Sequence, residues 1–241
     1  MLSVVIPTKN EEFWLPKLLA SIKAQTMQPY EVIIADAQSH DLTREVALRY
    51  GAKVVDGGGV AKGRNKGAQK AKGDFIFFLD ADVVLKDEKF FEKAVGEMVE
   101  RNLDLATCDV EPISKFLADK VLHNIYNTYV RVCGSFIPHA PGFCLLVRRK
   151  THEAVNGFDE SIVFCEDHDY AKRIAKNWNF GFLRSVKIPV SIRRLDRDGR
   201  LMIALKYILA EMHILFLGPI KHNKFNYTFG HASEGDSKKK L

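Results

Sequence analysis

Short apolar runs alternate with amphipathic stretches through the first third of the chain. The apolar runs, each closed by turn-forming or polar residues, cover residues 2–6, 31–35, 53–55 and 74–79. Runs of this length are typical of strands that are buried on both faces of a parallel sheet. The stretches with helical spacing cover residues 11–25, 42–50 and 64–71. This alternation predicts an α/β fold in which a Rossmann-like, mostly parallel sheet is flanked by helices and binds a nucleotide.

The second half of the chain is less regular. Helical spacing predicts helices over residues 116–132 and 166–176, and residues 143–147 are expected to form a strand. Residues 201–217 are almost wholly apolar. Because there is no internal repeat and no long linker, we expect one domain over residues 1–220 and a disordered tail over residues 230–241. The expected parts of the domain are a donor-nucleotide half (1–110), an acceptor half (111–198) and an apolar C-terminal helix (199–220).

Composition narrows the class of protein but not the ligand. Hydrophobic residues make up 46% and charged residues 27% of the 241 residues, which is typical of a soluble globular protein. The net charge of +6 favours anionic partners, and nucleotide phosphates, lipid head groups and nucleic acid all qualify. The four cysteines form no CxxC pair, so we expect reduced core thiols in a cytoplasmic protein. The chain begins directly with a strand, and a cleaved signal peptide is not expected.

Polar residues gather where the predicted strands end. Residues 5–11 turn from a strand into a helix, and open parallel sheets bind ligands at the carboxyl ends of their strands. Asp36 ends the second strand, where a carboxylate can accept hydrogen bonds from a base or a ribose. Each feature alone is equally compatible with an ordinary turn.

Two further groups follow along the chain. Gly57–Gly59 precede a basic segment with Lys62, Arg64 and Lys66, where a backbone could approach a phosphate closely, although the Walker spacing is absent. Asp80 and Asp82 come directly after a buried strand. Two hard oxygen ligands suit Mg²⁺ or Mn²⁺, which would neutralise a departing diphosphate. The alternative is a solvated acidic turn.

In this order the motifs resemble those of the family-two glycosyltransferases of GT-A fold. The matching residues are Pro7, Asn10 and Glu11; Asp36, Ser39, Asp41 and Thr43; Gly63, Arg64, Asn65 and Gly67; and Asp80 with Asp82. The likeness continues through residues 156–160 and 165–173, which are similar to the family's GGFDE and EDxDLxxR motifs, and spans residues 1–195. Ala37 and Gln38 depart from the family's usual loop. The QxxRW signature of processive members is missing, so transfer of one sugar per encounter is expected.

The resemblance implies a role for each matching residue and an inverting displacement assisted by Mn²⁺ or Mg²⁺. Asp36 would bind the base, with UDP favoured over GDP, and Pro7, Thr8, Asn10 and Glu11 would line the nucleoside pocket. Gly63, Arg64 and Asp80 would contact the donor, and Asp82 would be the main metal ligand beside Asp80. Asp167 would be the catalytic base, with Glu166 and Gly142 on the acceptor side. The alternative for the acidic residues at 166, 167 and 169 is enrichment in a first helical turn. A third metal ligand is sought among His213, His222 and His231, and none is assigned.

The C-terminal segment suggests the acceptor. Residues 201–217 are too interrupted for a membrane span, and arginines at 193, 194, 197 and 200 precede them. A helix of this kind over 199–220 could lie on the inner face of a membrane and meet a polyprenyl phosphate or glycolipid acceptor. The alternatives are packing on the sheet or in a homodimer, with a sugar hydroxyl as acceptor. No nucleic acid partner is expected.

Two rival functions stay open. One is a sugar-phosphate nucleotidyltransferase, although its glycine and arginine signature should follow the first strand and the glycines here lie near residue 57. The other is a non-catalytic module that binds a sugar nucleotide.

Overall fold

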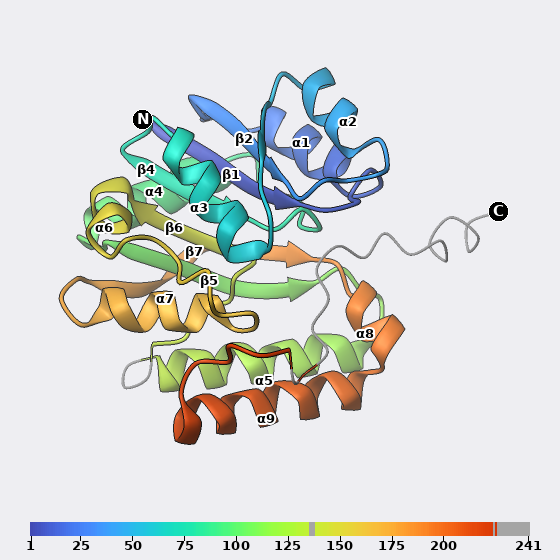
Figure 1. Ribbon diagram of the computed structural model, residues 1–241, viewed down its shortest axis with the longest axis vertical. Coiled ribbons are helices and arrows are strands. Elements are labelled where there is room, and N and C mark those ends of the chain that lie inside the picture. The colour runs from blue at the N-terminus through green and yellow to red at the C-terminus, as the bar shows by residue number, and fades with distance from the viewer. Residues whose placement is uncertain (135–137, 224, 226–241) are drawn as a thin grey trace.

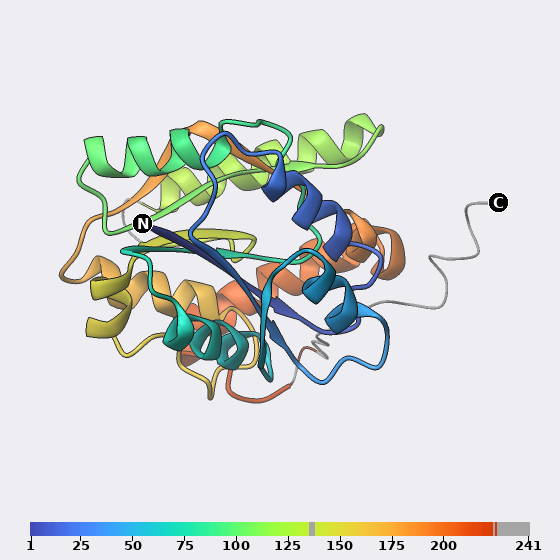
Figure 2. The ribbon, with the colours of Figure 1, turned by 90° about the horizontal axis from the view of Figure 1, so that it is seen from above.

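The computed structural model describes residues 1–134, 138–223 and 225, in which one seven-stranded sheet is covered by helices on both faces (Figures 1 and 2). The strand order is β3-β2-β1-β4-β6-β5-β7. The strands are β1 Leu2–Thr8, β2 Glu31–Asp36, β3 Lys53–Asp56, β4 Phe75–Leu79, β5 Leu105–Pro112, β6 Cys144–Arg148 and β7 Phe180–Val190. The helices are α1 Leu15–Lys23, α2 Thr43–Arg49, α3 Val60–Lys70, α4 Phe90–Glu100, α5 Leu117–Cys133, α6 Arg149–Ala154, α7 Glu166–Ala175, α8 Arg193–Asp198 and α9 Arg200–Leu217.

The first four strands form the parallel half that the apolar runs predict. β1 pairs in parallel with β2 and β4, and β2 pairs in parallel with β3. Successive residues of β1 point to opposite faces, so Val4 packs with α1 and α4 whereas Val5 packs with α3 and α7. Both faces are therefore buried, and the α/β fold is confirmed.

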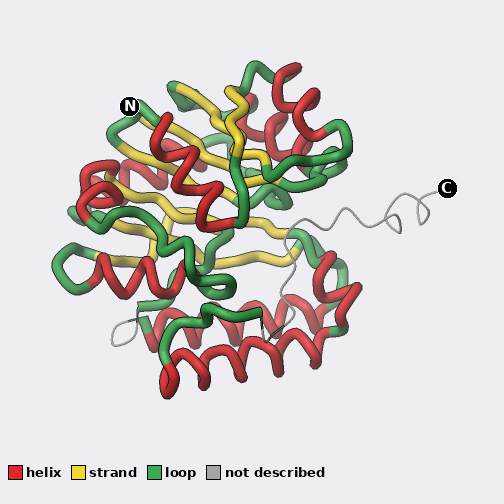
Figure 3. Tube along the Cα trace, in the orientation of Figure 1, coloured by secondary structure: helices red, strands yellow, loops and turns green. Residues whose placement is uncertain are grey.

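The other half of the sheet is mixed. β6 runs antiparallel to both β4 and β5, and β7 returns parallel to β5. β7 therefore points in the same direction as β1 and β4. The apolar pattern did not identify α4, β5 or β7, so this arrangement could not be predicted from it. Figure 3 shows the strands of the sheet, the helices around it and the loops that connect them.

Two predicted helix boundaries were wrong. α1 begins at Leu15, not at residue 11, and Pro16 stands in its first turn, where the missing N–H costs no hydrogen bond. α3 begins at Val60, not at residue 64, so Gly63 also lies on the helix and not in the loop before it. A Cβ at Gly67 would lie 2.2 Å from a methyl of Val5, so this glycine allows α3 to pack closely on β1.

Most large apolar side chains of the C-terminal helix are exposed, whereas Tyr207 and Ile214 pack on a small cluster around Phe164 and Ile220 outside the sheet. Ala210 is the only buried residue of α9, so the predicted alternative of a helix packed on the sheet is wrong within this chain. Arg200 at the start of α9 contacts Asp119 of α5 at 2.6 Å and joins the two helices at one end. No helix in the described part of the chain is both long and apolar enough to cross a membrane. The predicted tail over residues 230–241 lies outside the described residues.

Candidate active site

A buried arginine joins three of the predicted site residues. Arg64 is 1% exposed and comes from α3. Its Nη1 donates to Glu166 Oε1 at 2.8 Å, and its Nη2 donates to Asp80 Oδ1 at 3.1 Å and to the Gly142 carbonyl at 2.9 Å. One guanidinium therefore fixes the end of β4, the entry to β6 and the start of α7 at the same point.

The two carboxyl partners of Arg64 are held in a poorly hydrated environment. Burial raises the pKa of Asp80, although Arg64 opposes the shift. Burial also raises the pKa of Glu166, again against Arg64. Burial favours the protonated, neutral forms of Asp80 and Glu166, whereas the positive charge of Arg64 favours their ionised forms.

A cavity of about 60 Å³ opens beside this arginine, and its lining includes Arg64, Asp80, Gly142, Glu166 and Asp167. A Cβ at Gly142 would lie 2.7 Å from Asp167 Oδ2, so only a glycine leaves room for that carboxylate. Cys165, which precedes α7, has φ +60°, an uncommon conformation for a residue with a side chain. Residues in such unfavourable backbone conformations are often found at functional sites, where they fix the direction of neighbouring side chains.

A second arginine that the sequence analysis placed at the membrane is bound within the site. Arg193 donates both Nη atoms to Glu11 at 2.8 and 2.6 Å, and its Nε lies 3.0 Å from Asp82 Oδ2. Burial raises the pKa of Glu11 to about 7, although Arg193 opposes the shift. The proposed lipid contact of Arg193 was wrong, because carboxylates of the same chain already surround its guanidinium.

The other arginines around the start of α9 also lie near carboxylates. Arg197 contacts Asp198 at 2.5 Å, Arg200 contacts Asp119, and the charge of Arg194 acts on Asp80. These arginines therefore have carboxylates of the same chain as neighbours.

The donor-side residues lie at the carboxyl ends of β1 and β2. Asp36 is fully buried and accepts hydrogen bonds from Thr8 Oγ1 at 3.2 Å and from the Ser39 N–H at 3.0 Å. Asn10 has φ +54°, and its Oδ1 accepts the His40 N–H at 2.9 Å. Pro7 and Gly63 face each other, since a Cβ at Gly63 would lie 3.1 Å from Pro7 Cβ. These contacts join the first two loops, and the predicted contacts with a base stay predictions.

Asn65 has a role that its motif did not disclose. Its Nδ2 donates to the Phe158 carbonyl and its Oδ1 accepts the Phe158 N–H, both at 2.9 Å. A Cβ at Gly157 would lie 2.5 Å from Asn65 Oδ1, so the glycine is required for this contact. The two motifs at 63–67 and 156–160 thus bind each other and place α7 over the sheet.

The carboxylates that were predicted to hold a metal lie together at the end of β4. Asp82 is 5% exposed, and its oxygens are hard ligands of the kind that Mg²⁺ and Mn²⁺ prefer. Arg193 contacts one of these oxygens, so a cation would compete with the guanidinium for it. The donor set fits a divalent ion, with Arg193 as its competitor. Of the suggested third ligands, His213 contacts the Phe225 ring and His231 lies outside the described residues.

The sequence profile of glycosyl transferase family 2 matches residues 3–155, which is more than half of the chain. The chain belongs to this family. The match confirms that the motifs of the first half of the chain resemble those of the family-two glycosyltransferases.

Among curated relatives, the undecaprenyl-phosphate 4-deoxy-4-formamido-L-arabinose transferase of Aeromonas hydrophila is 43% identical over 98 residues. That alignment covers 34% of this chain and 29% of the relative. The curated relatives matched first are aligned over 27–35% of their own lengths, so the chain corresponds to a minor part of each.

Solved structures agree with the fold. The mannosyltransferase PcManGT from Pyrobaculum calidifontis, in complex with GDP-Man and Mn²⁺, has a TM-score of 0.65 and 20% identity, covering 86% of this chain and 64% of that one. S. aureus TarS in complex with UDP-GlcNAc has a TM-score of 0.64 and 19% identity, covering 79% and 58%. The GT-A type of α/β fold is thereby confirmed.

Proposed function

We propose that the protein transfers one sugar from a nucleoside diphosphate sugar to an acceptor, with inversion at the anomeric carbon. The observation that carries the proposal is the cavity beside Arg64, where Asp80 from the donor half meets Gly142 and Asp167 from the acceptor half. This juxtaposition supports a reaction between two substrates that enter from opposite sides. UDP is favoured over GDP by the resemblance, and solved relatives hold nucleotides of both kinds.

Asp167 is the proposed catalytic base. Its side chain is 16% exposed and lines the cavity, whereas Glu166 is 10% exposed and already bound by Arg64. For a hydroxyl acceptor, Asp167 would take the proton while the acceptor oxygen forms the new bond to the anomeric carbon. The diphosphate would leave with the electron pair of the old bond. Glu166 and Gly142 would keep this carboxylate aimed at the acceptor.

Asp82 and Asp80 are the proposed ligands of Mn²⁺, with Mg²⁺ as the alternative. A bound divalent ion would neutralise the charge that develops on the leaving diphosphate. Asp82 would exchange its contact with Arg193 for the ion, and the released guanidinium would remain beside Glu11. Pro7, Thr8, Asn10, Glu11 and Asp36 would form the nucleoside end of the donor site.

We further propose a lipid-linked acceptor reached at a membrane surface, in which the attacking group is a sugar hydroxyl carried by a polyprenyl-linked lipid. Asp167 would deprotonate such a hydroxyl, whereas a bare polyprenyl phosphate is already an anion and would need no base. Large apolar side chains are exposed on α9 and α5, an unusual density for a surface in water. They are Leu201, Met202, Leu205, Ile208, Leu209, Met212, Leu215, Phe216 and Leu217 on α9, and Leu117, Val121, Leu122, Ile125, Tyr129 and Val132 on α5. The name of the A. hydrophila relative includes undecaprenyl phosphate, which supports a lipid of the polyprenyl class.

The transfer reaction is tested by donor binding and turnover in the same preparations. We expect a UDP-sugar to raise the melting temperature, and more so with Mn²⁺. Asp167→Asn should keep donor binding but lose about 10²–10⁴-fold in turnover, because a general base contributes that much. Asp169→Asn is the control, since Asp169 contacts Arg173 at 2.7 Å and does not line the cavity.

Three outcomes would reject parts of this proposal. Turnover of Asp167→Asn within tenfold of the parent would remove Asp167 as the base. Donor binding without any release of UDP, in the presence of candidate acceptors, would favour the binding module. Pyrophosphate release from a nucleoside triphosphate would favour the nucleotidyltransferase.

The lipid surface is tested by co-sedimentation with vesicles. Leu205→Glu on α9 should reduce binding to vesicles, whereas Leu48→Glu on α2, which is 63% exposed in the parent, should not. If the parent does not sediment with vesicles of any composition and forms dimers that Leu205→Glu dissociates, the exposed face is a dimer interface instead.

A further inference from the structure

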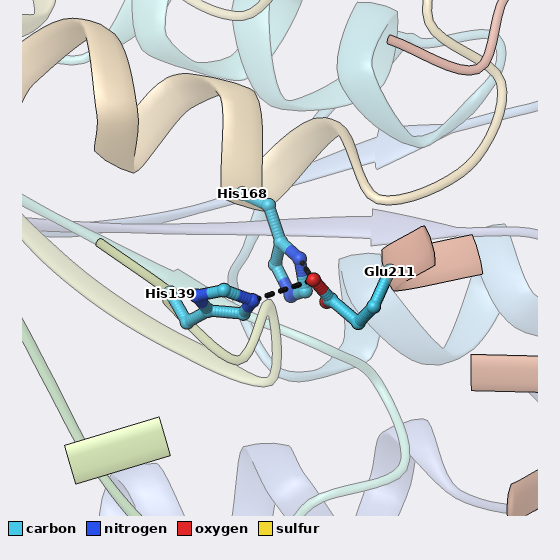
Figure 4. A group of neighbouring side chains, drawn as sticks. All are labelled: His139, His168 and Glu211. Atoms are coloured by element: carbon cyan, nitrogen blue, oxygen red, sulfur yellow. Dashed lines mark hydrogen bonds and ion pairs between the residues drawn. The ribbon is translucent and has the colours of Figure 1, made fainter. Parts of the chain in front are cut away.

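Three side chains outside the donor site meet between the acceptor loop, α7 and α9. His139 precedes β6, His168 belongs to the first turn of α7, and Glu211 comes from α9 (Figure 4). His139 Nε2 lies 2.7 Å from Glu211 Oε2, and His168 Nδ1 lies 2.9 Å from Glu211 Oε1. The two imidazole rings are 4.5 Å apart between centroids. Residues far apart in the sequence thus bring two imidazole nitrogens to the two oxygens of one carboxylate.

We propose that His139, His168 and Glu211 bind a zinc ion. One ligand atom from each residue lies within 4.8 Å of the others, and this is the group with that property in the part of the chain that the structure describes. Two imidazoles and one carboxylate are a ligand set that zinc uses in proteins, with a fourth position left for water. Ligand atoms around a tetrahedral zinc ion lie roughly 3.3 Å apart at bond lengths of 2.0–2.1 Å. The contacts to Glu211 would open by a few tenths of an ångström, and the three ligand atoms, which lie within 4.8 Å of one another, would close around a common ion.

Burial and charge both favour a cation at this position. His139 is 2% and His168 is 5% exposed, and buried imidazoles require a partner for each polar atom. Asp167 Oδ1 lies 3.9 Å from His168 Nε2, so a second carboxylate approaches the cluster from the cavity side. A dication would balance Glu211 and Asp167 together. Tyr129 packs edge-on against His139 and closes the cluster on its other side.

The site would position the acceptor half. His168 directly follows Asp167, and His139 precedes Gly142 by three residues, so an ion here would tie α9 to both walls of the cavity. The ion would add to the contacts that Tyr207 and Ile214 of α9 make with the small apolar cluster around Phe164. The zinc site is distinct from the donor-side carboxylates, because it includes neither Asp80 nor Asp82. The three ligands are positioning residues, and the zinc assignment does not depend on the proposed transfer reaction.

Metal content gives the direct test. Untagged full-length protein, expressed with added zinc and dialysed against metal-free buffer, should retain about one zinc per chain by mass spectrometry. Replacement by Co²⁺ should give the visible absorption of a tetrahedral nitrogen and oxygen site. Glu211→Gln and His139→Gln should each reduce zinc retention at least tenfold. His213→Gln, two residues along α9, should retain zinc like the parent, and Asp82→Asn should do so as well.

A chelator experiment on the parent covers the case in which a variant fails to fold. Removal of zinc should lower the melting temperature, and zinc at 100-fold above its dissociation constant should restore it by about 5–10 °C. Retention of zinc by both ligand variants would overturn the proposal. So would a parent that holds less than a tenth of an equivalent and shows no change in melting temperature with zinc. Preferential retention of Mn²⁺ that is lost in Asp82→Asn would assign the ion to the donor site and also overturn it.

Discussion

Replacing Arg64 by methionine tests whether the buried guanidinium holds the two halves of the site together. The substitution keeps an unbranched side chain but removes the contacts to Glu166, Asp80 and the Gly142 carbonyl. Glu166 then remains buried, and Asp80 partly buried, without the guanidinium that joins them. Breaking a buried ion pair by removing one partner costs about 3–5 kcal/mol. For a domain of this size that corresponds to a fall in melting temperature of about 6–20 °C.

The loss should depend on pH, and its sign follows from the pKa values. Burial already raises the pKa of Asp80 and Glu166, and Arg64 limits both shifts. Without Arg64 the folded protein binds more protons than the unfolded chain at a pH above the ordinary carboxyl pKa. Stability then falls as the pH rises through the raised pKa values of the folded state. The variant should therefore lose more stability at pH 8.0 than at pH 5.5.

Urea unfolding of the parent and Arg64→Met at these two pH values provides the measurement. Arg49→Met is the control, because the Arg49 side chain is 72% exposed and pairs with Glu45 on the same helix, α2. An exposed pair of this kind contributes about 0.3–0.5 kcal/mol. A loss below about 1 kcal/mol for Arg64→Met, or an equal loss at both pH values, would refute the reasoning.

Three further predictions concern other parts of the molecule. Burial lowers the pKa of His152 to about 4, so the folded state binds fewer protons than the unfolded chain and stability is lost as the pH falls. His152→Gln should remove about 2 kcal/mol of the loss between pH 7.5 and pH 5.0 in urea unfolding, and an unchanged loss would contradict the assignment. Gly67→Ala should destabilise by about 1–3 kcal/mol, because its Cβ would lie 2.2 Å from a valine methyl of β1. Gly96→Ala, which has open space on α4, should instead stabilise by about 0.5–1 kcal/mol, and thermal unfolding that ranks the two alike would contradict this. Because Arg193 contacts Asp82, Mn²⁺ alone should bind weakly, and UDP should tighten its binding in calorimetry because the diphosphate adds oxygen ligands. Equal Mn²⁺ affinity with and without UDP would contradict an ion held jointly by Asp82 and the diphosphate.

The donor half could be predicted from sequence because its information is local. Each strand of this half is one apolar run, and a polar residue such as Asp36 or Asp80 follows directly at the strand's carboxyl end. Since parallel strands end at one edge of a sheet, the order of the motifs was sufficient to place them together. The hydrophobic pattern predicted that these residues lie at that edge, and the resemblance to the family then predicted the role of each one.

The contacts that organise the site are not local. Arg64 and Glu166 are separated by 102 positions, and Arg193 and Glu11 by 182. No spacing rule connects residues so far apart, and a single basic residue is compatible with solvent, a lipid phosphate or a buried carboxylate. The sequence motif identified Asn65 but not its partner. The partner, the turn at Phe158, lies too far along the chain for any spacing rule to connect the two.

One of these contacts could have been inferred with a better reading of the second half. Val190 ends β7, and β7 has the same direction as β4, so the residues after it must lie at the same edge as Asp82. The bridge between Val83 and Val190 places them side by side. Arg193 follows three positions later, and two carboxylates spaced as Asp80 and Asp82 require positive charge when they are buried. Recognising the strand over residues 180–190 would therefore have predicted that Arg193 lies in the candidate active site and not at a membrane. The direction of this strand determines that Arg193 lies close to Asp82.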